Sequence, residues 1–518
     1  MTRLHAVAQP ATLWRVAPYY RLRCCIALCM VLIAVIGALT VLGCSNDDST
    51  TFVSATANDL TNRSFTFPTG AGPSLAAAIG LPQGQAFTME FANFGGTNVG
   101  PATLDSGGST ASGTVTLGSC TFRFDRSTFP AGRGPQSGAQ FTIDPCEVNR
   151  NDNTLRLTTA SGERLVSAPA NSLPKTNVAF VLTTDFSTGS YSVVDLATRN
   201  VFKDLKRGGV HSDAIARFFS GRVYVVNRLG ADSIQIIDPQ LGFITPTNGE
   251  PSVGTGTNPQ DIVFVNASKA YVSRLGSAQL VIINPTTLAR LGVLDLSRLV
   301  KPNDSDGSPE PAYMLIRNGL VYVALQHIDF KQPQLPKVAN GEVAVIDPTT
   351  DRIVTVIKLN GKNPLSELQF SPTLNRILVS SVGDFGVTDG GIEAINPDTN
   401  TVDVQFAISE ATIGGDITAF VIVSRTKGFA IVEDANFANS LVTFDPSTGQ
   451  RLKTIVGPLN VLVPHLAINS RNEVYLAVTD TQTATPGLRI FDALTENEIT
   501  TPPLNVGPLP PLFTLFIE

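Results

Sequence analysis

A short turn motif recurs along the last two thirds of this 518-residue chain. It consists of a β-branched or apolar run that ends in Asp or Asn, usually followed by Pro and then by Thr or Ser. The seven copies place the turn residue at Asp195, Asp238, Asn284, Asp347, Asn396, Asp445 and Asp492. The copies lie 43 to 63 residues apart. That period is too long for a single hairpin and is close to that of a four-stranded propeller blade.

Each repeat predicts the same set of strands. A second β-rich run precedes each turn, as in "RVYVVNR", and a third run precedes the second, while a fourth follows the turn, as in "RIVTVIKL". The first repeat lacks an inner run, whereas residues 512–518 form an inner run with no repeat after it. We therefore predict an all-β fold whose main part, residues 177–518, is a seven-bladed β-propeller, closed by the C-terminal strand that completes blade one.

Residues 177–518 resemble the bacterial YVTN-type β-propeller repeat proteins. The resemblance rests on "VYVVN" at 223–227 and on the turn motif, which reads "IDPTT" at 346–350. It implies an exported seven-bladed propeller. It does not imply one reaction, because this fold hosts many activities.

The N-terminus predicts export as a lipoprotein. Arginines between residues 3 and 23 precede an uncharged run that ends at "VLGC", before the polar "SNDDST". "VLGC" resembles a bacterial lipobox, so we predict a signal peptide at 1–43 and a palmitate-type lipid anchor on Cys44. An uncleaved membrane helix is the alternative, since about 20 apolar residues span a bilayer. Both readings place the remainder outside the cytoplasm, and Ser45 after the cysteine favours the outer membrane over the inner.

Short alternating runs between residues 44 and 168, such as "SGTVTLGSCTFRFD", predict the antiparallel strands of a small β-sandwich-like domain. Cys120 and Cys146 are the cysteines left once the signal and the lipid site are set aside. In an exported domain we expect them to form a disulfide, with two unpaired buried thiols as the alternative. Residues 169–176 carry two prolines and no periodicity, so we predict a linker there.

The charge balance argues against nucleic acid as a partner. Lys and Arg number 37 against 43 Asp and Glu, the net charge is −6, and no basic cluster is present. The four histidines are too scattered to indicate a zinc site.

The repeated turn residue is predicted to be structural. Asp or Asn at the first position of a turn accepts hydrogen bonds from the amides that follow. The two copies with Asn keep this acceptor and lose the charge, which a carboxylate that acts as an acid, a base or a cation ligand does not tolerate well.

A better candidate site comes from the starts of the inner strands, which should lie near one mouth of the channel. This register holds Asp213, Asp261, Tyr313, Glu367, Asp416 and His465. We predict that they form a channel-mouth site for a polar ligand or a cation, with Ca²⁺ as the possible cofactor and Asp213, Asp261, Glu367 and Asp416 as its ligands. Carboxylates that bond neighbouring amides or channel water are the alternative.

Blade four carries two extra segments. Long loops on a rigid scaffold are where binding concentrates. We therefore predict a partner-binding loop that includes His327, Asp329, Phe330 and Lys331. The other segment contains "NDSDG", a fragment of a calcium loop. Pro302 and Tyr313 fall where further ligands would be needed, so we expect a solvated loop there.

Three functions remain open at this level. The first is a lipid-anchored, extracytoplasmic binding or scaffold module with a ligand or a protein partner on the channel-mouth face. The second is a cation-dependent, lactonase-like hydrolase with its site at that mouth and an acid or His465 as base. The third is a purely structural envelope protein. No nucleophile elbow, phosphate-binding loop or H-E-x-x-H motif occurs in the sequence.

Overall fold

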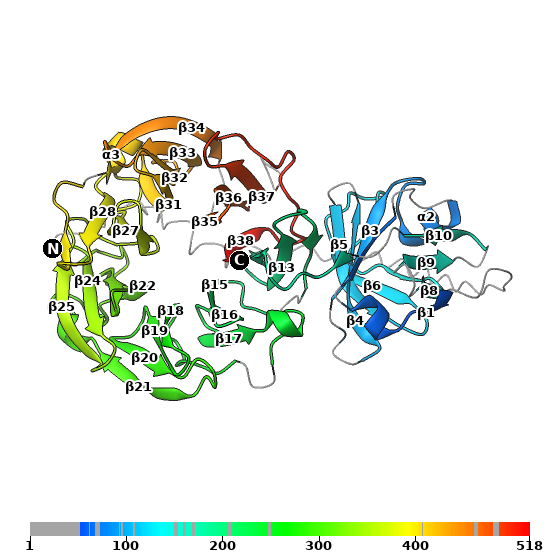
Figure 1. Cartoon of the computed structure of the whole chain (residues 1–518), viewed down its shortest axis with the longest axis horizontal. Coiled ribbons are helices and arrows are strands. Elements are labelled where there is room, and N and C mark those ends of the chain that lie inside the picture. Colours follow the sequence, from blue (N-terminus) through cyan, green and yellow to red (C-terminus); the bar gives the residue numbers. More distant parts are fainter. Residues whose placement is uncertain are drawn as a thin grey trace, which may run out of the picture.

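The computed structural model describes residues 52–518 apart from 62, 68–72, 93, 95–96, 107–108, 150–153, 159–161, 168–170, 206–208, 247–249, 407, 460–464 and 480–485. The predicted signal peptide at 1–43 and the predicted lipid site at Cys44 lie outside the described residues. In the part that is described, no helix combines the length and the apolar character needed to cross a membrane. That part is nearly all β: a small domain lies beside a ring of sheets (Figure 1).

The small domain contains two antiparallel sheets, in the orders β1-β8-β9-β10 and β11-β2-β3-β4-β5-β6-β7. Its elements are β1 (Phe52–Ser54), α1 (Ala57–Leu60), β2 (Arg63–Phe67), α2 (Pro73–Ile79), β3 (Phe87–Phe91), β4 (Val99–Ser106), β5 (Ser109–Thr116), β6 (Thr121–Ser127), β7 (Gln140–Thr142), β8 (Cys146–Asn149), β9 (Thr154–Thr158), β10 (Arg164–Val166) and β11 (Asn171–Ser172).

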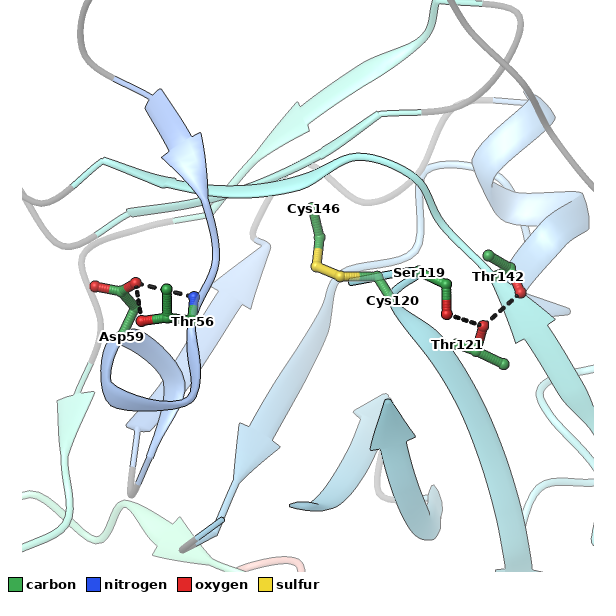
Figure 2. The surroundings of a disulfide bond; sticks show 7 residues. All are labelled: Thr56, Asp59, Ser119, Cys120, Thr121, Thr142 and Cys146. Atoms are coloured by element: carbon green, nitrogen blue, oxygen red, sulfur yellow. Dashed lines mark hydrogen bonds between the residues drawn. A yellow bond between two sulfur atoms is a disulfide. The ribbon is translucent and has the colours of Figure 1, made fainter. Parts of the chain in front are cut away.

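The predicted disulfide is present and joins the two sheets. Cys120 precedes β6 and Cys146 begins β8, with Cα atoms 6.2 Å apart (Figure 2). Beside Cys120, the hydroxyl of Thr121 lies 2.9 Å from that of Thr142 on β7. Both cysteines belong to a core in which phenylalanines of the seven-stranded sheet meet aliphatic residues of the four-stranded sheet, such as Val148 and Leu157. We expect it to stabilise this domain mainly by restricting the unfolded chain.

Two features of this domain were not predicted. "PSLAAAI" forms α2, because Pro is favoured in the first turn of a helix and the alanines after it have high helix propensity. The predicted linker contributes β11, whose Asn171 and Ser172 pair with Ser64 and Arg63 of β2. Residues 171 and 172 are therefore part of the seven-stranded sheet.

The remaining strands form antiparallel sheets that follow one another around a common centre, which is the β-propeller arrangement (Figure 1). The strands β15, β18, β22, β35 and β38 lie toward the centre, and β21, β25 and β34 lie at the periphery. The first three repeats contain β12 (Val178–Thr184), β13 (Gly189–Asp195) and β14 (Val201–Phe202); β15 (Ala214–Phe219), β16 (Arg222–Asn227), β17 (Ser233–Ile237) and the 3-10 helix η2 (Pro239–Leu241); and β18 (Pro259–Asn266), β19 (Lys269–Arg274), β20 (Gln279–Ile283), β21 (Arg290–Asp295) and the 3-10 helix η3 (Ser297–Leu299). The next two contain β22 (Pro311–Arg317), β23 (Leu320–Leu325), β24 (Glu342–Asp347) and β25 (Arg352–Lys358); and β26 (Gln369–Ser371), β27 (Arg376–Ser381), β28 (Gly391–Asn396), β29 (Thr401–Val402), β30 (Ile408–Ser409) and α3 (Glu410–Ile413). The last two contain β31 (Asp416–Ser424), β32 (Lys427–Glu433), β33 (Asn439–Asp445) and β34 (Gln450–Leu459); and β35 (His465–Ile468), β36 (Glu473–Val478) and β37 (Gly487–Asp492), and they are followed by β38 (Pro511–Ile517).

The C-terminal strand belongs to the sheet of the first repeat. β38 pairs antiparallel with β12, with Val178 opposite Ile517 and Leu182 opposite Phe513. Strand order in this sheet is β14-β13-β12-β38, so β38 takes the inner position that the first repeat lacked in the sequence.

Tyrosines on the middle strands join neighbouring sheets. These strands are buried on both faces because each sheet packs between two others, which explains their continuous apolar runs. The hydroxyl of Tyr224 donates to the carbonyl of Pro285 at 3.0 Å, and that of Tyr322 donates to Asn400 Oδ1 at 2.5 Å. Each acceptor lies in the turn of the following sheet. The recurring turn is thus the acceptor for the tyrosine of the preceding repeat.

The turn prediction is confirmed at the level of hydrogen bonds. Asp347 Oδ1 accepts the amide of Thr349 at 2.8 Å, and Asn284 Oδ1 accepts that of Thr286 at 2.9 Å. The same contact to the residue two positions on is made by the other copies, Asp195, Asp238, Asn396, Asp445 and Asp492.

The small domain contacts the propeller through charged groups. Glu90 accepts the amide of Lys203 at 2.8 Å, and the ammonium of Lys203 pairs with Asp105. Burial raises the pKa of Glu90 to about 7, against the opposing effect of Lys203. Nearby, Arg126 and Asp185 form an ion pair of 2.6 Å.

Candidate functional site

The predicted channel-mouth residues all lie at or next to the start of an inner strand. Asp416 and His465 begin β31 and β35, whereas Asp213 and Glu367 precede β15 and β26. Asp261 and Tyr313 are the third residues of β18 and β22. The structure divides the six into a central cluster and two outlying acids.

An arginine that sequence reasoning did not single out organises the central cluster. Arg217 of β15 donates from Nε to Asp261 Oδ1 at 2.8 Å, and its Nη2 lies 2.8 Å from Glu367 Oε1. Its guanidinium carbon is 5.9 Å from the ring centroid of Tyr313. Arg217 of β15 therefore contacts side chains from β18, from β22 and from the segment just before β26.

Asp261 and Glu367 both pair with Arg217, but their pKa values shift in opposite directions. Burial raises the pKa of Asp261 above its ordinary value, and Arg217 offsets only part of this effect. Asp261 has no exposed surface, and besides Arg217 it accepts the amide of Met314 at 2.9 Å. Burial by itself would raise the pKa of Glu367. The guanidinium of Arg217, with smaller contributions from other groups, has the larger opposite effect, so the pKa of Glu367 lies below its ordinary value. Both acids are thus compensated within the protein.

The two outlying acids have partners of their own. The guanidinium of Arg228 binds Asp213, with Nε 2.9 Å from Oδ1. Asp416 accepts the amide of Gly386 at 2.8 Å, and burial raises the pKa of Asp416 to about 6. Neither carboxylate joins the pair around Arg217.

His465 is buried and neutral. Burial lowers the pKa of His465 to about 4, with Glu367 opposing this shift. Its Nδ1 accepts the amide of Thr514 at 3.3 Å, so the proton of the neutral ring is on Nε2. The ring lies against Phe513, with centroids 3.9 Å apart. In this state the imidazole offers a hydrogen-bond donor and no free basic nitrogen.

A cavity of about 230 Å³ lies beside this cluster. Its polar wall consists of Arg217, Glu367, Gln369, His465 and Thr514. Its apolar wall comes from Val421 and from residues of β35 and β38, including Phe513. The hydroxyl of Thr514 is buried and has no hydrogen-bond partner among the described residues. Polar groups that converge on a partly apolar cavity are the usual composition of a small-molecule site.

Sequence reasoning missed Arg217 and Thr514. Arg217 is the charged residue in the inner run "AIARFF", four residues after the register that was aligned, and a search for charges within apolar runs would have found it. Thr514 had no comparable signal, since an isolated Thr in a strand is ordinary.

Among the described residues, the structure brings three possible metal-ligating carboxylates together at one place, and it is not the ring. Asp304, Asp306 and Glu310 each offer an oxygen, all within 4.8 Å of one another. Asp304 and Asp306 of the loop containing "NDSDG" are half-buried, and Glu310 is buried. Burial, with Asp306 and Asp304 adding to it, raises the pKa of Glu310 to about 10.

The predicted partner-binding loop has a buried half and an exposed half. His327 has no exposed surface and its Nε2 lies 3.0 Å from Glu342 Oε2. Asp329 is 1% exposed and accepts the hydroxyl of Ser305. Neither faces a partner, because both hold the loop to the propeller. Phe330 and Lys331 are on the surface.

Comparisons with known proteins give only distant similarity. No protein-family model matches the chain, and no curated protein matches it. Among solved structures, dihydro-heme d1 dehydrogenase NirN in complex with DHE is 14% identical, with a TM-score of 0.42 over 65% of this chain and 74% of that one. Apo AztD from Citrobacter koseri is 11% identical, with a TM-score of 0.40 over 65% and 97%. The β-propeller domain of Myceliophteria thermophila Cps50 (Swd1) is 10% identical, with a TM-score of 0.41 over 65% and 93%. The propeller assignment therefore rests on the arrangement of the sheets.

Proposed function

We propose that this chain is a lipid-anchored, extracytoplasmic β-propeller of the YVTN type that acts as a binding or scaffold module in the cell envelope. The observation that carries the binding role is the central cavity. Its wall combines the Arg217–Glu367 ion pair and the neutral His465 with the unpartnered hydroxyl of Thr514. This set fits a small polar ligand that accepts a hydrogen bond from His465 and exchanges one with Thr514.

The scaffold in this proposal is a closed propeller of seven blades. Support for closure comes from the pairing of β38 with β12. It also comes from the link between the last repeat and the first, where Arg199 donates to the hydroxyl of Tyr475 at 2.6 Å. This link joins the middle strand of one repeat to the turn of the next, as at Tyr224 and Tyr322.

The hydrolase alternative has less support from the geometry. A general base needs a free basic atom within reach of the substrate. His465 uses Nδ1 for the amide of Thr514, and Asp261 and Glu367 are paired with Arg217. The cavity thus offers hydrogen-bond donors and a compensated charge pair, which suits binding.

Native mass spectrometry of the full-length protein, purified from its own envelope in detergent, tests the binding role. We expect a bound small molecule in the wild type. Ala467 lines the cavity, so Ala467→Phe should fill it and abolish the adduct, and Thr514→Val should weaken it. Asp347→Asn, at a distant turn, is the matched control and should retain it. A wild type without adduct and without a thermal shift from a library of small polar metabolites contradicts the proposal.

The anchor has a separate test. Metabolic labelling with a palmitate analogue should mark the wild type and leave Cys44→Ala unlabelled, with the label recovered in the outer-membrane fraction. Equal labelling of the two proteins contradicts lipid attachment at Cys44.

A further inference from the structure

Two long connections around β22 and β23 are held together by carboxylates. The first connection, residues 296–310, leads into β22, and the second, residues 326–341, follows β23. Phe330 donates its amide to Asp306 Oδ2 at 2.7 Å, and Ile328 donates its amide to Glu310 Oε2 at 2.8 Å. Acids of the first connection therefore fix the backbone of the second.

The same acids form a compact cluster with unused oxygens. Glu310 has no exposed surface, and its Oε1 is buried without a hydrogen-bond partner. Asp304 Oδ2 is likewise buried and unpartnered. Within the described part of the chain, no lysine, arginine or histidine forms an ion pair with Asp304, Asp306 or Glu310. Two of the three acids thus carry a buried oxygen that no described group satisfies.

Such an arrangement calls for a compensating cation. A buried carboxylate oxygen without a partner is costly, and neighbouring like charges add to the cost. A hard cation bound between the acids gives the buried oxygens a partner and offsets the repulsion between the like charges. Ca²⁺ takes six to eight oxygens at about 2.4 Å, so ligands on opposite sides of one ion lie about 4.8 Å apart. The three carboxylate oxygens lie within 4.8 Å of one another. Mg²⁺ gives up its bound water reluctantly and requires near-octahedral geometry at about 2.1 Å per ligand, whereas Ca²⁺ accepts a flexible coordination geometry.

We propose that Asp304, Asp306 and Glu310 bind one Ca²⁺ ion, and that this ion locks the connection 296–310 to the connection 326–341. Glu310 supplies Oε1 from the buried side, and the two aspartates supply oxygens from the half-buried loop. Water and backbone carbonyls complete the coordination. The lock fixes the exposed Phe330 and Lys331 on the surface, so calcium controls the segment that is available to a partner. The site is separate from the central cavity and does not depend on it.

Isothermal titration calorimetry with Ca²⁺ tests the site on the full-length protein in detergent, after chelator treatment. We expect one ion per chain with a dissociation constant on the order of 10⁻⁴ to 10⁻³ M, the range of extracellular calcium modules. Calcium should also raise the thermal midpoint and slow proteolytic cleavage between residues 296 and 341. Mg²⁺ at the same concentration should have a smaller effect on all three measurements.

Two variants assign the response to these residues. Glu310→Gln keeps the side-chain shape and the bond to Ile328, and should weaken binding at least about tenfold because it removes one ligand charge. Asp304→Asn keeps the acceptor Oδ1 and should act in the same direction, which leaves the test intact if Glu310→Gln fails to fold. Glu410→Gln is the matched control. Glu410 is as buried as Glu310, but both its oxygens accept amides, from Ile417 and Gly390.

Three results overturn the proposal. A wild type with no calcium heat and no thermal shift means that a proton shared among the acids replaces the ion. A calcium response of full size in both Glu310→Gln and Asp304→Asn places the ion elsewhere. Loss of the response in Glu410→Gln as well shows a general destabilisation.

Discussion

The centre of the propeller and the connection 296–310 bury the same chemical group in opposite ways. At the centre, Asp261 and Glu367 share the guanidinium of Arg217. In the connection, Asp304, Asp306 and Glu310 face one another with no basic side chain in contact among the described residues. The first arrangement is complete within the protein. The second requires a proton or a cation from solution, so the acids to examine for a metal are those without arginines.

Removal of the central arginine should have the largest effect. Arg217→Met leaves the fully buried Asp261 without its cation, and breaking a buried pair in this way costs about 3–5 kcal/mol. The free energy of unfolding from urea denaturation should fall by that amount. Arg217→Lys keeps the positive charge but loses the paired donors of the guanidinium, so its free energy of unfolding should lie between those of the wild type and Arg217→Met. A loss below about 1 kcal/mol in Arg217→Met means that the pair is not the main compensation.

Glu90, at the contact between the domains, is intermediate between the arginine-paired acids of the centre and the unpaired acids of the connection, because it has a single lysine, Lys203, nearby. Its folded pKa of about 7 lies above the ordinary glutamate value of 4.5, so the folded protein holds this proton more tightly than the unfolded chain. Its contribution to stability is therefore greatest at low pH, falls as the pH rises from about 4.5 to about 7, and is flat above. Glu90→Gln keeps an acceptor for Lys203.

In urea unfolding at pH 5 and pH 8, the wild type should lose about 3 kcal/mol more than Glu90→Gln between the two conditions, as an upper estimate from the pKa difference. Parallel pH profiles for the two proteins contradict the raised pKa.

Removal of one acid from the connection should change the free energy of unfolding in the opposite direction to removal of the arginine at the centre. In the presence of chelator, Glu310→Gln should raise the free energy of unfolding by about 1–3 kcal/mol, because it removes an unsatisfied buried oxygen and a like charge. The same change should be destabilising relative to wild type once calcium is saturating. A stability loss in chelator contradicts the description of this cluster as uncompensated.

The smallest effect is expected at the recurring turn. Asp347→Asn retains the acceptor for the amide of Thr349, as Asn284 does naturally for Thr286. The thermal midpoint should be unchanged within error, whereas Asp347→Ala, which loses the acceptor, should lower it. A clear loss in Asp347→Asn means that the charge itself matters at this corner.

The sequence predicted the repeating part of the fold well because the signals there are local. Recurring β-branched runs identified strands such as β16 and β24, and the expectation of an exported domain with two remaining cysteines predicted the disulfide between Cys120 and Cys146. The helix α2 was not predicted, because the seven residues of "PSLAAAI" are too few to show a helical repeat of apolar positions. The strand β11 lay in a segment with prolines and no period, and only its pairing with β2 made it a strand.

The candidate site was predicted in part. The inner-strand register identified Asp261, Tyr313, Glu367 and His465, which do gather at the centre. It gave no partners for them, because Arg217 lies 44 residues from Asp261 in the chain. The acid cluster was dismissed because its spacing does not match a known calcium loop. Glu310 is brought to Asp304 and Asp306 by the fold of the connection and by its bond to Ile328.

By itself, the sequence determined the repeat, the strand order and the function of Asp347 as a corner. These depend on β-rich runs and on hydrogen bonds between residues two or three positions apart, which are local in the chain. Only the tertiary structure decided which carboxylates are paired and which are not. Charge compensation in a buried site depends on which distant side chains arrive there, and that is set by how the sheets pack around the centre.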